Sequence, residues 1–258
     1  MTDSYYRRLG EHEYASTDFT RSNWTPEIQH GSPPLALLTR AIEDELDGSG
    51  LRIGRLGLDI LGAIPVAPLR VRTSVPRPGK RIALVEAEMA PASGPSRPVA
   101  RVTAWALAPS DTAAVVTDRY PPLIEAPAVA PPGFWWDAPG YLESVEFRNQ
   151  SDDAGARVVW MTSRVGLIDD EPTTALQRLT MVVDSANGVG AALDPSQYAF
   201  MNTDTVLHLH RLPLGQDFAV RARGSIGPDG VGVTTAEVFD RDGYLGTSAQ
   251  TLLVQRIG

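Results

Sequence analysis

Residues 32–46 read SPPLALLTRAIEDEL, and the apolar side chains in this stretch recur at the spacing of an α-helix. They are Leu35, Leu38, Ile42 and Leu46. Positions three and four apart share one face of a helix, so the stretch predicts a helix with one apolar face to bury. Pro33 and Pro34 suit a first helical turn, and Ser32 suits the cap before it. We therefore expect a helix over residues 33–46.

Strand-like runs follow this helix, and no second helical pattern interrupts them. The runs cover residues 53–61, 69–75, 81–89 and 99–107. Pro78 and Gly79 mark a turn between the second run and the third. A helix followed by several strands argues against a parallel sheet or a dinucleotide-binding fold, in which strands and helices alternate. We expect the helix to pack across one face of a curved antiparallel sheet.

The second half of the chain repeats this order. Strand-like runs at residues 144–147 and 158–165 come first, and a helix is then predicted over residues 173–184. Four further runs follow this helix, at residues 201–210, 218–225, 231–239 and 245–254. The turn residues also recur, because Pro-Asp-Gly at residues 228–230 takes the place of the Pro-Gly turn in the first half.

Equivalent segments of the two halves lie about 150 residues apart, which indicates a duplicated domain. For example, Leu-Asp-Ile-Leu at residues 58–61 corresponds to Leu-His-Leu-His at residues 207–210. A proline-rich stretch separates the halves, and proline neither continues a helix nor donates to a sheet. We therefore expect an N-terminal domain at residues 1–115, a linker at residues 116–140 and a C-terminal domain at residues 141–258. Each domain is an α+β unit, in which an antiparallel sheet wraps a long helix.

The composition excludes several classes of function. The chain has 258 residues, a net charge of −8 and 43% hydrophobic residues, which is enough to bury a core. Lys80 is its only lysine, and an acidic chain without a basic run is a poor binder of nucleic acid. The absence of cysteine excludes disulfides and thiol nucleophiles. No apolar run reaches the roughly 20 residues of a membrane span, and residues 1–10 lack the apolar core of a signal peptide, so we expect a cytoplasmic protein.

Two signatures mark the halves. In the first half, Trp24 precedes His-Gly-Ser-Pro-Pro at residues 30–34, which leads into the helix. In the second half, Asp184 lies late in a helix, and a strand runs from Asn-Thr-Asp at residues 202–204 to His-Arg-Leu-Pro at residues 210–213. In order and spacing, over nearly the whole chain, these signatures resemble the double-hotdog acyl-CoA thioesterases of the bacterial thioesterase II type. The resemblance implies a tandem double hotdog.

The resemblance also implies hydrolysis of acyl-CoA to a free acid and CoA, with CoA as part of the substrate and no cofactor. In this family an aspartate, a threonine or serine, and a glutamine of the second hotdog hold the attacking water. Asp184 and Gln250 fall on the aspartate and glutamine positions, and Asn202 falls where the hydroxyl residue is expected. Asparagine departs from the pattern, although its amide also hydrogen-bonds water. We expect Asp184, Asn202 and Gln250 to be the catalytic residues.

These residue types suit thioester hydrolysis for physical reasons as well. The attacking water must lose a proton, so a carboxylate must lie within hydrogen-bond reach of it. Asp184 follows an apolar segment of its helix, where partial desolvation suits a base. The first-half equivalent of Gln250 is Ala104, so the polar group exists in one copy. One active site per chain is therefore expected, in the second half.

Further residues are candidates for substrate binding. The developing oxyanion needs hydrogen-bond donors, and the helix start at His30 and Gly31 offers them. Arg211 is a candidate for the CoA phosphates, because arginine pairs with phosphate bidentately. His208 and His210 share one strand face, but no third ligand stands out except Asp204 or Asp184, so we expect no metal.

Two alternative classes of function stay open at this point. A non-hydrolytic acyl-CoA or acyl-carrier binding protein would keep the fold without the chemistry, and Asn202 favours it. A purely structural, oligomer-forming protein is the other. A serine hydrolase of the common type is disfavoured, because no Gly-x-Ser-x-Gly elbow occurs. Hotdogs usually pair edge to edge, so we expect homo-oligomers in either case.

Overall fold

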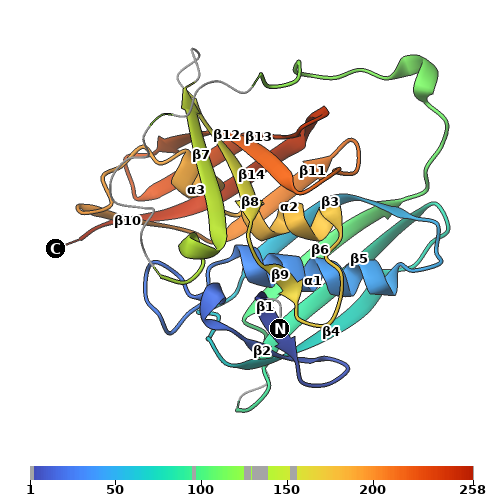
Figure 1. Ribbon diagram of the computed structural model, residues 1–258, viewed down its shortest axis with the longest axis horizontal. Coiled ribbons are helices and arrows are strands. Elements are labelled where there is room, and N and C mark those ends of the chain that lie inside the picture. The colour runs from blue at the N-terminus through green and yellow to red at the C-terminus, as the bar shows by residue number, and fades with distance from the viewer. Residues whose placement is uncertain (1–2, 95–96, 125–128, 130–138, 152–155, 258) are drawn as a thin grey trace.

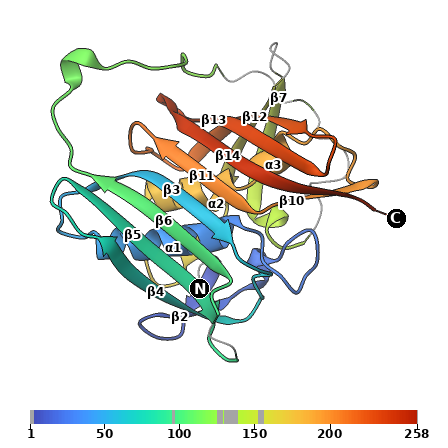
Figure 2. The ribbon, with the colours of Figure 1, turned by 180° about the vertical axis from the view of Figure 1, so that it is seen from behind.

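A computed structural model describes residues 3–94, 97–124, 129, 139–151 and 156–257 (Figure 1). In this part of the chain the strands join into one 14-stranded sheet that curves around three α-helices. Figure 2 shows the opposite side, where strands β3, β5 and β6 lie in front of helix α1. No helix in the described ranges is long and apolar enough to cross a membrane.

The N-terminal half consists of α1 (Ser32–Glu45) and a sheet of long strands. These strands are β3 (Arg52–Ile60), β4 (Pro68–Arg77), β5 (Ile82–Pro91) and β6 (Ala100–Leu107). Their order in the sheet is β3-β6-β5-β4, and every neighbouring pair is antiparallel. Two short strands that the sequence did not predict, β1 (Ser4–Arg8) and β2 (Glu13–Ser16), extend the sheet beyond β4. The predicted helix and four strands are confirmed.

Helix α1 forms because its apolar stripe faces the sheet. Leu35, Leu38 and Ile42 are completely buried, and the helix packs on β4, β5 and β6. Burying each of these side chains stabilises the fold by about 1.5–3 kcal/mol. The helix ends near Leu46, and Gly48 then takes the left-handed conformation at a φ of 69° that L side chains avoid.

The C-terminal half has the same plan with a shorter helix. Its elements are β7 (Val145–Ser151), β8 (Arg157–Ser163), β9 (Gly166–Ile168), α2 (Ala175–Val183), α3 (Ala186–Val189), β10 (Tyr198–Asn202), β11 (Asp204–Leu209), β12 (Asp217–Ile226), β13 (Val231–Asp240) and β14 (Gly243–Arg256). Thr174 caps α2 by accepting the N–H of Gln177, whose side chain accepts the N–H of Thr174 in return. This capping box explains why α2 begins later than predicted.

The strand predicted over residues 201–210 is two strands, and the break lies at Thr203. Among the described residues β10 pairs only with β14, whereas β11 pairs with β14 on one side and β3 on the other. At Thr203 the chain therefore leaves the edge of the C-terminal sheet and enters the seam between the halves, where β11 pairs with β3. At this seam Leu207 pairs with Leu56, so the two repeats meet along their equivalent strands.

The linker is partly described. Tyr120 packs against Phe239 and Tyr244, so this end of the linker crosses the C-terminal sheet. Residues 125–128 and 130–138 lie outside the described residues. The domain boundaries at residues 115 and 140 stay predictions.

Helices α1 and α2 pack against each other in opposite directions, which creates two helix-end contacts. At one contact, Glu43 near the end of α1 binds the capping residue of α2, Thr174. At the other, Asp184 at the end of α2 meets Gly31 at the start of α1. The second contact contains the candidate site.

Candidate active site

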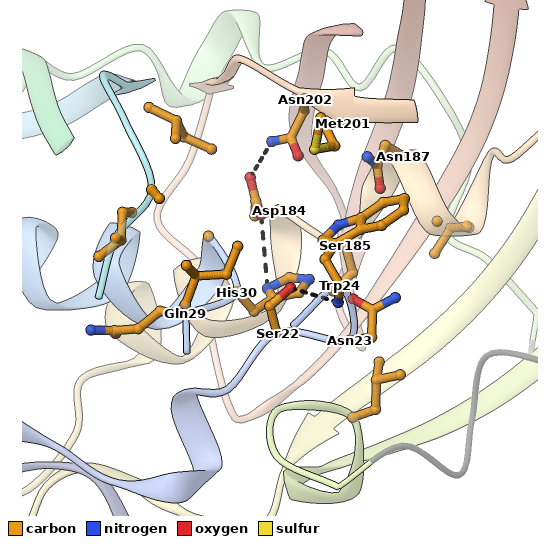
Figure 3. Close-up of a pocket in the computed structure, with 18 of the residues that line it drawn as sticks. Ser22, Asn23, Trp24, Gln29, His30, Asp184, Ser185, Asn187, Met201 and Asn202 are labelled. Carbon is orange, nitrogen blue, oxygen red and sulfur yellow. Dashed lines mark hydrogen bonds and ion pairs between the residues drawn. The ribbon is translucent and has the colours of Figure 1, made fainter. Parts of the chain in front are cut away.

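Asp184 directly follows α2 and is almost fully buried. The packing of the two helices places its carboxylate against the start of α1 (Figure 3). Asp184 also lines a cavity of about 280 Å³, together with His30, Gly31 and Asn202. Three of the residues predicted for catalysis or substrate binding therefore share this cavity with the predicted base.

One carboxylate oxygen of Asp184, Oδ1, lies among three side-chain donors. Thr205 Oγ1 is 2.5 Å from it, Asn202 Nδ2 is 2.8 Å away and Gln250 Nε2 is 3.3 Å away. Gln250 Nε2 also donates to Thr205 Oγ1 and to the backbone oxygen of Asp184, each at 2.9 Å. Such donors hold the carboxylate in one orientation. The other oxygen, Oδ2, is left to face α1.

Strand pairing brings the three donors together. Asn202 ends β10 and Thr205 lies in β11, and both strands pair with β14, which carries Gln250. Thr205 and Gln250 point inward and are 1% exposed. The donors consequently come from three strands, while the acceptor comes from the end of a helix.

Oxygen Oδ2 of Asp184 lies so close to α1 that the helix start must be glycine. A Cβ atom at Gly31 would stand 2.3 Å from Oδ2, far inside van der Waals contact. The first turn of α1 has few free donors, because Pro33 and Pro34 have no N–H and the N–H of Ser32 donates to His30 Nδ1. No acceptor within the described residues takes the N–H of Gly31. This N–H is therefore available to a ligand in the cavity.

His30 is held as a neutral imidazole with one defined tautomer. Its Nδ1 accepts the N–H of Ser32 at 3.1 Å, so the ring proton belongs on Nε2. The ring stacks on Tyr141 with centroids 3.8 Å apart, and burial lowers the pKa of His30 to about 4 although the nearby Asp184 carboxylate opposes this shift. The 3.8 Å approach of Nδ1 to Asp184 Oδ2 is consequently no ion pair near neutral pH.

The lowered pKa of His30 predicts a pH-dependent stability. Unfolded histidine binds a proton near pH 6.5, whereas folded His30 does so near pH 4, so this residue destabilises the fold progressively as pH falls between these values. The full loss is about 3 kcal/mol. We expect His30→Gln to remove this component, measured as the free energy of unfolding in urea at pH 7, 5.5 and 4.5. The exposed His12, changed to Gln, is the matched control, and an unchanged slope in His30→Gln would contradict the assignment.

Tyr141 connects the two helices at the candidate site. Its hydroxyl donates to the backbone oxygen of Met181 at 2.9 Å and contacts Ser32 and Ser185. Burial raises its pKa well above the usual range for tyrosine, so the group stays neutral. Tyr141 therefore links the start of α1 to the end of α2 and supports the ring of His30 from below.

The cavity beside Asp184 has mainly apolar walls. Its apolar lining includes Trp24, Ile28, Ile60, Ile64, Leu142, Phe147, Val189 and Met201. Trp24 contacts Phe200 edge-on, with ring centroids 6.1 Å apart, and 39% of its surface stays exposed. Figure 3 shows Trp24 and Met201 on the same side of Asp184. An apolar cavity that reaches a buried carboxylate suits a ligand with an apolar tail and one polar reacting group.

At the opposite helix-end contact, the carboxylate is hydrogen-bonded to the neighbouring helix. Glu43 accepts hydrogen bonds from Thr174 Oγ1 and, at 2.7 Å, from Gln177 Nε2. Burial raises the pKa of Glu43, and these two hydrogen bonds oppose the rise. Both of its partners belong to the capping box of α2, so the carboxylate caps a helix at this end. The two ends of the helix pair thus differ, in keeping with the expectation of one site per chain.

Arg211 does not lie at the cavity. Its guanidinium binds both carboxylate oxygens of the buried Asp240, at 2.6 and 2.7 Å, and the backbone oxygen of Gly243. A buried carboxylate needs a partner, and Arg211 is the partner of Asp240. This ion pair holds the turn between β13 and β14, so we no longer assign Arg211 to the CoA phosphates. His210 contacts the backbone oxygen of Tyr244. The described residues contain no cluster of three or more side chains able to bind a metal.

Thr205 is the site residue that sequence reasoning missed. Asn202 was expected at the hydroxyl position, yet the hydroxyl next to Asp184 belongs to Thr205. The signal was present in the alternation of β11, because Thr205, Leu207 and Leu209 share the inward face. A polar side chain at an inward position of a strand marks a buried hydrogen bond.

Comparisons with known families match both halves of the chain. Residues 20–107 match the family described as the acyl-CoA thioesterase N-terminal domain. Residues 122–254 match the family described as the acyl-CoA thioesterase C-terminal domain. No curated protein matches the chain.

Solved structures of similar fold cover nearly the whole chain. An acyl-CoA thioesterase II from Mycobacterium marinum is 14% identical with a TM-score of 0.67, and the match covers 98% of this chain and 96% of that one. A conserved protein with a hot dog fold from Alicyclobacillus acidocaldarius is 15% identical with a TM-score of 0.69, covering 97% and 96%. At such identities the likeness shows the fold, and the predicted double hotdog is confirmed.

Proposed function

This chain belongs to the acyl-CoA thioesterase family and is a thioester hydrolase, and on that premise we propose that it hydrolyses acyl-CoA with a water activated by Asp184. One observation carries the proposal. Oxygen Oδ1 of Asp184 is held among three donors, while Oδ2 faces the helix start, and Asp184 lines the cavity. A carboxylate held on one side is a base whose other oxygen has a defined direction.

In the proposed reaction, a water bound to Asp184 Oδ2 loses a proton to the carboxylate as its oxygen attacks the thioester carbonyl. The tetrahedral intermediate carries its negative charge on the former carbonyl oxygen. The N–H of Gly31 and Nε2–H of His30 are the donors proposed for this oxygen. Collapse of the intermediate breaks the carbon–sulfur bond, and the proton on Asp184 passes to the departing CoA thiolate.

The role that we propose for the amides differs from the one expected from the sequence. Asn202 and Gln250 donate to Asp184 itself, so we propose that they orient the carboxylate, with Thr205, and do not bind the water directly. This arrangement also accounts for the asparagine at position 202. A hydroxyl is not required there when Thr205 supplies one to the same oxygen.

The proposal is tested by thiol release from acyl-CoAs of increasing chain length. We expect kcat/KM for the best substrate of about 10⁴ M⁻¹ s⁻¹ or more, the lower range for enzymes on a natural substrate. The same acyl groups on a carrier-protein arm serve as the comparison. Well-folded protein that releases no thiol from any acyl-CoA would rule out the proposed substrate.

A further inference from the structure

Three buried polar atoms lie together behind the candidate site without a hydrogen-bond partner in the described residues. They are Thr234 Oγ1, Ser248 Oγ and Gln250 Oε1. Thr234 and Gln250 are directly paired across β13 and β14, and Ser248 lies two positions before Gln250 on the same inward face. The three residues are at most 3% exposed. Buried polar atoms in native proteins almost always have a partner, so a group of three requires one.

The amide of Gln250 has a defined orientation, and in this orientation its oxygen needs a hydrogen-bond donor. Its Nε2 donates to the backbone oxygen of Asp184 and to Thr205 Oγ1, each at 2.9 Å. A flipped amide would bring a carbonyl oxygen against the oxygens of Asp184 and lose both bonds. Oxygen Oε1 of Gln250 therefore points away from Asp184 and Thr205, and it can be satisfied only by a donor on its own side of the amide.

Thr234 Oγ1 lies on the β12 side of its strand, 3.7 Å from the position that a Cβ atom of Gly224 would take. A water about 2.8 Å from each of two polar atoms can bridge a gap that is too wide for a direct hydrogen bond. The neighbouring inward positions carry small residues, since Gly224 pairs with Thr234, and Ala236 pairs with Ser248. Helix α3 packs over β12, β13 and β14.

We propose that Thr234, Ser248 and Gln250 bind a buried water, and that this water makes Thr234 and Ser248 positioning residues for Asp184. The water donates one hydrogen to Gln250 Oε1 and the other to one hydroxyl, and it accepts a hydrogen from the second hydroxyl. Three such bonds are typical of a buried water. None of the three residues lines the cavity, so neither the substrate nor the attacking water occupies this place.

The functional part of this inference rests on the proposed hydrolysis. The bound water fixes the orientation of the Gln250 amide, and the amide fixes Thr205 and oxygen Oδ1 of Asp184. The direction of oxygen Oδ2 is thereby fixed as well. Removing the two hydroxyls frees the amide to rotate and to withdraw its donor. The substrate still binds, because the cavity is unchanged, but the base is misdirected.

The test combines a crystal structure with kinetics. We expect density for one water within hydrogen-bond distance of the three atoms in the wild type and none in the double variant Thr234→Val/Ser248→Ala. We expect kcat of the double variant to fall roughly 10- to 100-fold, with KM within about twofold. Ser248→Ala with Thr234→Ser keeps one hydroxyl at position 234 and is expected to recover most of the loss. Thr235→Val, the next residue on the exposed face of β13, is the control without effect.

Distinct outcomes would overturn the inference. Wild-type density in which a hydroxyl binds Gln250 Oε1 directly, with no water, would remove the site. A double variant with wild-type kcat, alongside an inactive Asp184→Asn, would remove the positioning role and leave the hydrolysis standing. An inactive wild type would instead contradict the proposed reaction, and the crystal structure alone would then decide the water site. If the double variant does not fold, the single variants Thr234→Val and Ser248→Ala are compared with the wild type in the same way.

Discussion

Replacing Asp184 with asparagine is expected to lower kcat for thioester hydrolysis by about 100-fold or more, the usual contribution of a general base. The asparagine keeps the shape of the side chain, and its carbonyl oxygen can still accept from Asn202, Thr205 and Gln250. The amide nitrogen would then replace Oδ2 and could not accept a proton. The expected result is therefore a loss of kcat with little change in KM, measured by thiol release.

A matched control separates this loss from a change of charge. Asp229→Asn removes a carboxylate from the exposed turn between β12 and β13, and we expect wild-type kcat. The melting temperatures of both variants should stay near that of the wild type. If folded Asp184→Asn kept more than a third of wild-type kcat, another group would have to be the base.

Replacing Gly31 with alanine is expected to inactivate the protein by moving Asp184. The added Cβ would lie 2.3 Å from Oδ2 and 2.8 Å from Cγ of Asp184. The backbone of Gly31 is not the obstacle, because its φ of −68° and ψ of −25° are ordinary helical values that alanine adopts readily. The carboxylate must swing away from its three donors. We expect kcat to fall by about 100-fold and the free energy of unfolding to fall by about 1–3 kcal/mol.

The cause of that destabilisation can be isolated with a second substitution. In Gly31→Ala/Asp184→Ala the Cβ meets no carboxylate, so we expect the stability lost in Gly31→Ala to return in part while activity stays low. Gly10→Ala is the matched glycine control, because its nearest new neighbour would be 3.9 Å away. Stability is measured by urea unfolding and activity by thiol release. Additive stability losses in the double variant would show that Gly31 and Asp184 are not in contact.

The elements of this fold follow closely from local sequence pattern. Helix α1 was predicted because its apolar residues repeat at helical spacing, and the long strands because apolar runs end at Pro-Gly or Asp-Gly turns. These signals extend over a few residues, so each segment carries its own. The break at Thr203 was missed because it depends on which strands lie beside the chain at that point.

The candidate site was only partly accessible from sequence. Asp184, Gln250 and Asn202 were identified, and the structure places Gln250 and Asn202 within hydrogen-bond distance of the Asp184 carboxylate. Thr205 was missed, and Arg211 was assigned to a ligand although it holds Asp240. Side chains of these types are common on strand surfaces, so type alone does not tell a solvated arginine from a paired one.

What the sequence determined by itself is the double-hotdog plan and the segments from which a site can be built. The tertiary structure decided which atoms meet. Oxygen Oδ2 of Asp184 reaches Gly31 only because two helices cross at one angle, and Thr205 meets Gln250 only because β11 and β14 pair in one register. A shift of one residue in that register would turn Thr205 outward. Local periodicity sets how a segment folds, whereas hydrogen bonds between distant segments depend on packing to a fraction of an ångström.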